Sequence, residues 1–333
     1  MPSPTNKAVV LGSGSWGTAL AMILSEHFAE VVIIGRCPYQ SAEICTQNTN
    51  SRYLPQVPLA KNIRSTTDLI EAKSADIILF VVPTSATREI STQLAKMGIP
   101  SKIPLISCAK GIELGTGSRM SNIIHENLPK NPIAVISGPN HAEEVAQQLA
   151  TCTVVGSIDK DLATNLQKFF SNKNFRTYTS QDVAGMELGG ALKNVFAIAA
   201  GIAAGIGLGD NAIAALVTRG LAEMTRLGIA LGGQPDTFMG LSGMGDLMTT
   251  CYSKHSRNNR VGMALGKGLS LRQACDELGM VAEGVPNTQS IYEAARETDI
   301  DTPIIDAVYN VLYHDKPARE AVQELLSRCP KAE

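Results

Sequence analysis

The feature that most constrains this chain is a glycine-rich turn between two apolar segments close to its start. Residues 8–11 (AVVL) lead directly into GSGSWG at 12–17, and 18–24 (TALAMIL) continue with helical character. In a strand–turn–helix unit, the first of three such glycines permits a tight bend and the second lets a pyrophosphate approach the backbone. The third allows close packing of helix and strand. With a second apolar run at 31–34, the pattern favours a dinucleotide site over a purely structural turn, formed around Gly12, Gly14 and Gly17.

The first half of the chain alternates short β-branched runs with helical patterns, which is typical of βαβ units and a parallel sheet. Further strand-like runs occur at 76–82, 105–108, 133–137, 152–155 and 175–178. In open α/β sheets, ligands bind beyond the carboxyl ends of the strands. We therefore expect the loops that follow these runs to surround the dinucleotide.

The composition changes near residue 182, where Ala, Gly, Leu and Met replace the β-branched runs. The sequence predicts an α/β Rossmann-type dinucleotide-binding domain over residues 1–185, followed by an all-helical C-terminal domain over 186–333. The small residues of this second part allow helices to pack closely and fit a homodimer. Helices are predicted over 183–207, 211–231, 256–266, 271–278, 287–297 and 304–312.

Composition excludes several classes of protein. The net charge of −2 argues against broad nucleic-acid binding, which needs a basic surface. The longest apolar stretch, 195–206, contains Gly201 and Gly205 and is too short to span a bilayer, so it predicts a buried helix. Residues 1–7 have no long apolar segment and are interpreted as a short tail, not a signal peptide.

The cysteines and histidines favour a cytoplasmic protein without a metal. The seven cysteines are scattered and form no C-x-x-C pair, which fits free thiols in a reducing compartment. The five histidines form no H-x-x-x-H pattern and no cluster with cysteine, so we expect no structural zinc site.

Arg36 follows the second strand, where an acidic residue usually binds the ribose hydroxyls of NAD. An arginine there can pair with a 2′-phosphate through its planar guanidinium, which an acid would repel. The position thus favours a cofactor-binding role for Arg36 over that of a solvated arginine at a strand end. We therefore expect NADP(H) to be accepted, alongside or instead of NAD(H).

Lys193 stands inside an apolar, alanine-rich helical segment. Burying an unpaired ammonium is costly, so the side chain either reaches solvent or serves a site. Desolvation would lower its pKa and make the neutral amine available as a base. The pattern alone leaves both alternatives open.

Two further segments concentrate polar groups in this charge-poor half. Residues 241–247 (LSGMGDL) predict a glycine-punctuated turn that presents Asp246, and residues 256–258 place a hydroxyl, a guanidinium and an amide near a helix start. Together with helix N–H groups, these side chains would form an anion site. Singly, Asp246 also fits a turn or capping residue, and Arg257 a surface charge.

At this point the residues resemble a known family, the bacterial NAD(P)-dependent sn-glycerol-3-phosphate dehydrogenases. The matching segments cover most of the chain and follow the family's order. They are GSGSWG at 12–17, VVPTSA at 81–86, AKGIE at 109–113, ISGPNHAEE at 136–144, GGALKNVFAIAAGI at 189–202, RGLAEMTRLG at 219–228, FMGLSGMGDLMTTC at 238–251, SRNNRVG at 256–262 and VAEGVPNT at 281–288.

The resemblance implies that Lys193 is the proton acceptor in the interconversion of dihydroxyacetone phosphate and sn-glycerol 3-phosphate, which supplies the backbone of phospholipids. The implied cofactor contacts are Gly12, Gly14, Ser15, Trp16, Gly17, Arg36, Lys110, Ala142, Arg257, Val281 and Glu283. The implied substrate contacts are Lys110, Gly138, Asn140, Lys193, Asp246, Ser256, Arg257 and Asn258.

The chain departs from the family pattern at two places. Asn140-His141 stands where the family often has Thr-Phe, and Met244 replaces a common leucine of similar volume. Three rival functions fit the residues less well. A dehydrogenase for a substrate without phosphate has no need of the 256–258 cluster, and a non-catalytic NAD(P)H sensor has no need of Lys193. A methyltransferase would carry an acid in place of Arg36.

Overall fold

The computed structural model describes residues 5–279 and 282–329 of the chain, which fold as two compact units. Unit 1 comprises Met1–Ala109 and Arg119–Val183, and unit 2 comprises Lys110–Ser118 and Ala184–Glu333. The short segment 110–118 therefore packs with the second unit although it lies within the sequence of the first. The domain predicted from the sequence, 1–185, instead includes the segment 110–118.

Unit 1 is built on one eight-stranded sheet with the order β3-β2-β1-β4-β5-β6-β7-β8. Its neighbouring strands are parallel, except that β7 runs antiparallel to β6. The predicted strands are confirmed, and one short strand that was not predicted, β3, is added. The bounds are β1 Thr5–Leu11, β2 Phe28–Ile34, β3 Ile63–Thr66, β4 Ile77–Phe80, β5 Leu105–Ser107, β6 Ile133–Ser137, β7 Thr151–Gly156 and β8 Phe175–Ser180.

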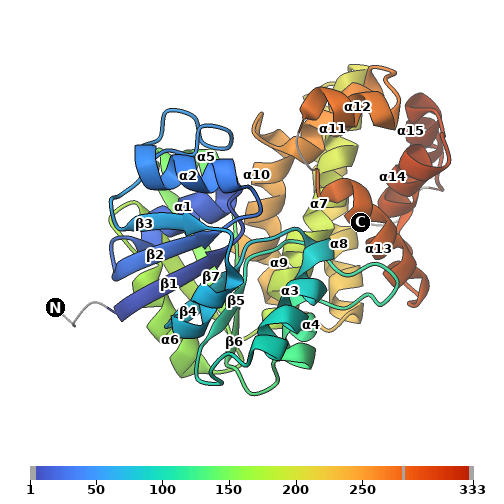
Figure 1. The fold of residues 1–333 in the computed structure, drawn as a ribbon. Coiled ribbons are helices and arrows are strands. Elements are labelled where there is room, and N and C mark those ends of the chain that lie inside the picture. Colours follow the sequence, from blue (N-terminus) through green and yellow to red (C-terminus); the bar gives the residue numbers. More distant parts are fainter. Residues whose placement is uncertain (1–4, 280–281, 330–333) are drawn as a thin grey trace. The chain divides into compact units, whose positions relative to one another are not determined.

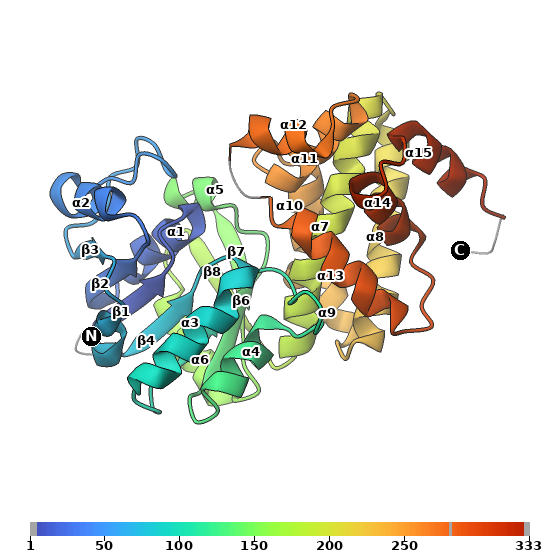
Figure 2. The ribbon, with the colours of Figure 1, turned by 45° about the vertical axis from the view of Figure 1, so that its right-hand side comes forward.

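Helices cover both faces of this sheet (Figure 1, Figure 2). Because side chains alternate along a strand, β1 contributes Ala8 and Val10 to one apolar core and Val9 and Leu11 to the other. The first core receives residues from α1, α2, α5 and α6, and the second from η1, α3 and α4. The bounds are α1 Ser15–Leu24, α2 Pro38–Gln47, η1 Leu69–Ser74, α3 Thr84–Met97, α4 Met120–Asn127, α5 Ala142–Ala146 and α6 Lys160–Phe169.

Unit 2 is helical, as predicted, and packs around its first long helix. α7 passes a length and hydropathy test for a membrane span, but 83% of its most apolar window is buried inside the structure, which fits the core helix of a folded unit. The bounds are α7 Val183–Ile206, α8 Asp210–Ala230, α9 Pro235–Met239, η2 Leu241–Gly245, α10 Asp246–Tyr252, α11 Arg257–Gly266, α12 Leu271–Leu278, α13 Gly284–Arg296, α14 Pro303–Tyr313 and α15 Ala318–Leu326.

α7 and α11 touch through their backbones because both carry glycines at the contact. A Cβ on Gly201 would lie 2.0 Å from the Asn259 carbonyl oxygen, and one on Gly262 would lie 2.1 Å from that of Ile198. No side chain fits at either position. This contact brings the start of α11, where Asn258 lies, close to the part of α7 that carries Lys193 and Asn194.

One local prediction in unit 2 is confirmed only in part. Residues 241–247 do present Asp246 after a turn, but the turn is helical: Leu241–Gly245 is a π-helical turn that leads directly into α10, whose first residue is Asp246. A Cβ on Gly243 would lie 2.2 Å from the Phe238 carbonyl oxygen, so the glycine lets this turn pack tightly against α9. The glycines therefore serve helix packing, and Asp246 gains a rigid helical mount.

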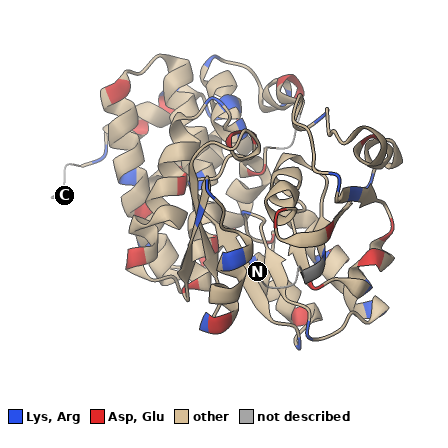
Figure 3. Ribbon diagram, turned by 90° about the vertical axis from the view of Figure 1, so that its left-hand side faces the viewer, with Lys and Arg blue, Asp and Glu red and all other residues tan. Residues whose placement is uncertain are grey.

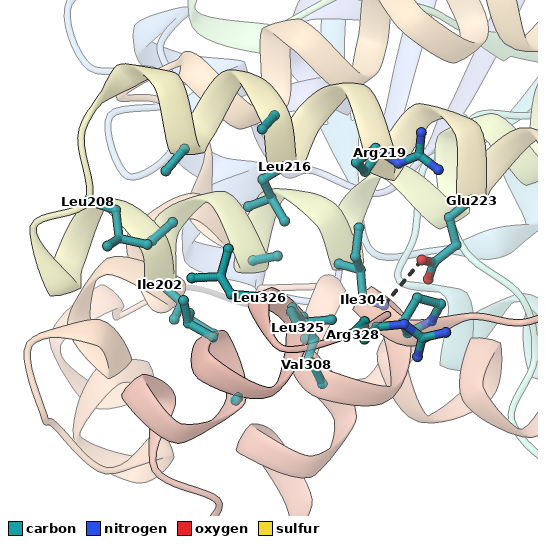
Figure 4. Close-up of a pocket in the computed structure, with 18 of the residues that line it drawn as sticks. Ile202, Leu208, Leu216, Arg219, Glu223, Ile304, Val308, Leu325, Leu326 and Arg328 are labelled. Atoms are coloured by element: carbon teal, nitrogen blue, oxygen red, sulfur yellow. Dashed lines mark hydrogen bonds between the residues drawn. The ribbon is translucent and has the colours of Figure 1, made fainter. Parts of the chain in front are cut away.

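A groove with a volume of about 790 Å³ runs between α7 and α8 on one side and α14 and α15 on the other (Figure 4). Ile202 and Leu208 lie toward one end, while Arg219, Glu223 and Arg328 lie toward the other. The buried Glu223 carboxylate accepts hydrogen bonds from the N–H groups of Ile304 and Ile305 at 3.1 and 3.0 Å. This carboxylate thus caps the N-terminus of α14.

Charged residues of both signs are mixed along the part of the ribbon that Figure 3 draws from this side, with Lys and Arg interspersed among Asp and Glu. All seven cysteines are free, as their scattering predicted. Within residues 5–279 and 282–329, no group of three or more His, Cys, Asp or Glu side chains is arranged to hold a metal ion.

Candidate active site and nucleotide-binding loop

The loop between β1 and α1 has a backbone that only glycine can form. Gly12 has φ +117°, and a Cβ there would lie 2.3 Å from the Val81 carbonyl oxygen. A Cβ on Gly17 would lie 2.0 Å from the Gly12 carbonyl oxygen. Gly14, in contrast, faces open space, with no atom within 4 Å of its missing side chain. The loop therefore leaves room for a ligand at the middle glycine only.

The N-terminus of α1 points toward that open space with no side chain capping it. Gly14 is the N-cap residue, and the Ser15 hydroxyl is turned to the Tyr53 carbonyl oxygen at 3.1 Å. The buried Trp16 indole Nε1 has no hydrogen-bond partner among the described atoms. Uncapped helix N–H groups beside a bare glycine suit an anion, so the loop fits the pyrophosphate of a dinucleotide.

Other predicted cofactor positions lie around the same edge of unit 1. Arg36 is exposed two residues beyond the end of β2. Ala142 is buried at the start of α5, a helix that packs against α1. Their contacts with a cofactor stay a prediction.

Gly138 and Asn140 follow β6 at the carboxyl edge of the sheet. Gly138 has φ +145°, which disfavours any other residue there. The Asn140 side chain is buried and donates to the Thr153 hydroxyl of β7 at 2.9 Å. This bond holds the loop to the neighbouring strand, and the expected contact of Asn140 with substrate stays a prediction.

The chemistry of unit 2 centres on one carboxylate that binds two ammonium groups. Asp246, at the start of α10, is 1% exposed. Its Oδ2 accepts from the Lys110 Nζ at 2.7 Å, and its Oδ1 accepts from the Lys193 Nζ of α7. Lys193 itself is 5% exposed, so it does not reach solvent by extending along the helix surface. Two cations against one anion leave the cluster with a net positive charge.

Thr250 completes the surroundings of the Lys193 amine. Its hydroxyl donates to the Asp246 carbonyl oxygen one helical turn earlier at 2.6 Å, so a lone pair faces Lys193 Nζ, also at 2.6 Å. Within the described chain, Asp246 and Thr250 are the acceptors bound by this nitrogen. An ammonium has three protons, so one is left for an oxygen outside the protein.

Burial and charge tune both partners of this cluster. Burial lowers the pKa of the Lys193 ammonium to about 8, with Asp246 acting to raise it and Lys110 acting to lower it further. Burial also acts to raise the pKa of the Asp246 carboxyl, but the two lysines outweigh it and hold that pKa below its ordinary value. An amine poised near neutral pH beside a permanent carboxylate can both accept and return a proton.

A chain of amides joins this cluster to α11 and α13. Asn194 donates from Nδ2 to the Lys110 carbonyl oxygen at 3.1 Å, and its Oδ1 accepts from the Asn258 Nδ2 at 2.9 Å. The Asn258 Oδ1 in turn accepts from the Gly284 N–H at 3.0 Å. Asn258 is therefore fixed inside unit 2, at the first turn of α11, where the sequence predicted a substrate contact.

The remaining predicted residues lie at two helix starts. Ser256 is the N-cap of α11, its hydroxyl accepting from the Asn259 N–H at 3.2 Å, and Arg257 is exposed at the first position of that helix. Glu283 directly precedes α13. Val281 lies outside the described residues.

Three polar residues of this region were not singled out from the sequence. Thr250, Asn194 and Asn287 all lie on helices, where threonine and asparagine carry no periodic signal. All three lie inside segments that resemble the family. The one available clue was that each is a polar residue within an apolar helical face.

The groove of Figure 4 is a different place, because neither Lys193, Asp246 nor Arg257 lines it. Its walls are mainly aliphatic, with few groups able to move a proton. The polar cluster of α7 and α10 is therefore the better candidate for chemistry.

Comparison with known proteins assigns the family. Residues 7–163 match the family described as the NAD-dependent glycerol-3-phosphate dehydrogenase N-terminus, and residues 182–323 match the corresponding C-terminus. The glycerol-3-phosphate dehydrogenase [NAD(P)+] of Enterococcus faecalis is 47% identical over 331 residues, covering 98% of this chain and 97% of its own length.

Solved structures agree with this assignment. The glycerol-3-phosphate dehydrogenase of Coxiella burnetii superposes with a TM-score of 0.94 at 36% identity, covering 98% of this chain and all of its own. The yeast enzyme, from Saccharomyces cerevisiae, superposes with a TM-score of 0.84 at 30% identity, covering 97% of this chain and 100% of its own. The chain belongs to the NAD(P)-dependent glycerol-3-phosphate dehydrogenase family.

Proposed function

We propose that this chain reduces dihydroxyacetone phosphate to sn-glycerol 3-phosphate, and catalyses the reverse oxidation, with Lys193 as the group that moves the proton. The observation that carries the proposal is the buried cluster in which Lys193 and Lys110 share the carboxylate of Asp246. The product would supply the glycerol phosphate backbone of phospholipids. The free cysteines fit a cytoplasmic location.

The reaction moves a hydride and a proton together. A bound nicotinamide would supply the hydride acceptor for substrate C2 in the oxidation and the hydride donor in the reduction. In the oxidation, the neutral amine of Lys193 takes the proton of the C2 hydroxyl as the C–H bond breaks. In the reduction, the Lys193 ammonium donates that proton to the oxygen of the former carbonyl. The third ammonium proton, bound by neither Asp246 nor Thr250, is the one available for this transfer.

The neighbours of Lys193 set its direction and charge. Asp246 and Thr250 fix two of the three N–H directions, so the amine is oriented before substrate binds. The net positive charge of the cluster favours the negative charge that develops on the C2 oxygen. Lys110 adds to that charge and keeps the Lys193 pKa low.

The phosphate of the substrate requires a separate anion site, which we place at the start of α11. Arg257 is exposed there, beside the N–H groups of the first helical turn. A guanidinium pairs with a phosphate through two parallel hydrogen bonds. Ser256 and Asn258 are bound internally and would shape this site.

The cofactor is held by unit 1. The bare Gly14 and the uncapped start of α1 would receive the pyrophosphate, and the exposed Arg36, two residues after β2, would lie beside the adenosine ribose. A guanidinium there pairs with the 2′-phosphate, so we expect NADPH to be used along with NADH.

The substrate assignment is tested by following NADH and NADPH absorbance with dihydroxyacetone phosphate and with dihydroxyacetone. We expect turnover with the phosphorylated substrate and a kcat/KM lower by orders of magnitude without the phosphate. Arg257→Ala should lower kcat/KM for dihydroxyacetone phosphate by ~10²-fold and narrow the gap between the two substrates, because charge-assisted contacts at a remote group align the reacting carbon.

Arg272→Ala is the matched control, because Arg272 is an exposed arginine on the neighbouring α12 with an ordinary helix ion pair to Asp276. It should leave the preference unchanged. No turnover with dihydroxyacetone phosphate would overturn the proposed reaction. An unchanged preference in Arg257→Ala would move the phosphate site elsewhere, and Lys110 would be tested next.

A further inference from the structure

We infer that Asn287 is a positioning residue for this reaction: its buried amide ties together the two backbone segments that carry Lys110 and Lys193. The Asn287 Oδ1 accepts from the Ile112 N–H at 3.1 Å, and its Nδ2 donates to the Ala191 carbonyl oxygen at 2.8 Å. The side chain belongs to α13, which supplies neither lysine. The inference rests on the proposed role of Lys193.

The two bonds fall at matching places in the sequence. Ile112 follows Lys110 by two residues, and Ala191 precedes Lys193 by two residues. Both lysines then meet on the same carboxylate, one on each oxygen of Asp246. A single amide thus sets the separation of the two backbones close to the point where their ammonium groups converge.

The two lysines differ in how firmly their own backbone is held. Lys193 lies within the 24-residue helix α7, whose hydrogen bonds fix it. Lys110 lies in the segment 110–118, which has no helix of its own and joins unit 2 from within the sequence of unit 1. Its position depends on tertiary contacts, so Lys110 is the partner that the loss of Asn287 would displace.

Besides the ion pair of the lysine itself, the contacts that anchor the Lys110 end of this segment include one apolar contact and two hydrogen bonds. The Ile112 side chain is 3% exposed in the core of unit 2, its N–H is bound by Asn287, and the Lys110 carbonyl oxygen is bound by Asn194. Of the two hydrogen bonds, that of Asn194 comes from α7 and that of Asn287 from α13. Because Asn287 is 2% exposed, water cannot readily replace its amide.

Displacement of Lys110 should change the pKa of the Lys193 ammonium in a defined direction. Lys110 acts to lower the pKa of the Lys193 ammonium, since two cations near one carboxylate disfavour each other. If Lys110 moves away from Asp246, Lys193 holds its proton more tightly. The midpoint of the pH profile for the oxidation of sn-glycerol 3-phosphate should then move to higher pH.

The test is Asn287→Ala, with Lys110→Met and the double variant in parallel. We expect Asn287→Ala to lower kcat for the oxidation by ~10–10²-fold, as a misplaced catalytic group does, and to raise the pH midpoint in the same direction as Lys110→Met. In the Lys110→Met background the same substitution should change neither kcat nor the midpoint further, because the residue it positions is already gone. Asn287→Ser, which keeps a hydroxyl for one of the two bonds, should show a smaller shift and serves if the alanine variant does not fold.

Asn131→Ala is the matched control, because that asparagine is also buried and donates from Nδ2 to two carbonyl oxygens, those of Pro100 and Ile103, both at 2.9 Å. It lies in unit 1 and should lower the melting temperature while leaving kcat and the pH midpoint unchanged. The same behaviour in the Asn287 variants would overturn the inference, as would full additivity with Lys110→Met. If the proposed function itself were wrong, the result would differ. Lys193→Met would stay active, and its pH profile for the oxidation would keep the wild-type midpoint.

Discussion

Lys193→Met is expected to lower kcat by ~10²–10⁴-fold in both reaction directions, while the folded protein still binds its cofactor. Methionine keeps much of the volume of the lysine stem but can neither accept nor donate the proton. Removing the buried ammonium beside Thr250 and Asp246 also leaves Lys110 as the lysine that pairs with Asp246. Steady-state rates in both directions measure the effect.

Cofactor binding provides the internal control for this variant. The loop that we propose for dinucleotide binding belongs to unit 1, so the fluorescence change on NADH binding should be close to that of the wild type. A near-normal kcat would remove Lys193 from the mechanism. If kcat and the affinity for NADH fell by the same factor, the substitution would be acting on the structure and not on proton transfer.

Asp246→Asn should have the second large effect, on both activity and stability. The amide has nearly the shape of the carboxylate but cannot balance two buried ammonium groups, and removing one partner of a buried ion pair costs about 3–5 kcal/mol. Lys193 also loses the neighbour that acts to raise its pKa, so it deprotonates at lower pH and the reduction loses its proton donor. We expect kcat for the reduction at pH 7.5 to fall by ~10²-fold or more.

Charge balance makes this prediction specific. In the wild type both lysines pair with the Asp246 carboxylate, and Asp246→Asn removes that negative charge from both. Adding Lys110→Met removes one of the two ammonium groups. The urea concentration at the midpoint of unfolding should therefore return most of the way to the wild-type value in the double variant, while activity does not recover. Glu223→Gln, which neutralises another buried carboxylate of unit 2, should leave kcat unchanged. Equal stability of Asp246→Asn and wild type would contradict this view of the cluster.

The sequence predicted the fold well where strong local signals exist. The apolar runs at 8–11 and 31–34 became neighbouring parallel strands, and the glycine turn took the backbone that only glycine allows. β3 escaped prediction because its four residues, IRST, carry too few apolar side chains to stand out. The helical form of the turn at 241–247 was not predicted because glycines that permit close helix packing look the same in sequence as glycines that bend a loop.

The candidate site was predictable in its charged members and not in their arrangement. A lysine in an alanine-rich helix and an aspartate after a glycine run stand out, so Lys193 and Asp246 were singled out. Thr250 was missed because its role depends on lying one turn after Asp246 with its lone pair toward another helix. The packing of segment 110–118 with the helical unit is a tertiary event with no local signal, and it is what delivers Lys110 to Asp246.

The most direct test of the central claim is the pH dependence of kcat/KM measured in both directions above pH 7. In the proposed mechanism oxidation needs the neutral amine of Lys193 and reduction needs its ammonium, and burial lowers the pKa of that ammonium to about 8. We therefore predict that the oxidation rate rises, and the reduction rate falls, as pH increases through the same midpoint near 8. If kcat/KM for oxidation and for reduction changed in the same direction with pH, the assignment of Lys193 as the proton-transfer group would be contradicted. The same holds if Lys193→Met kept the opposed pH profiles of the wild type.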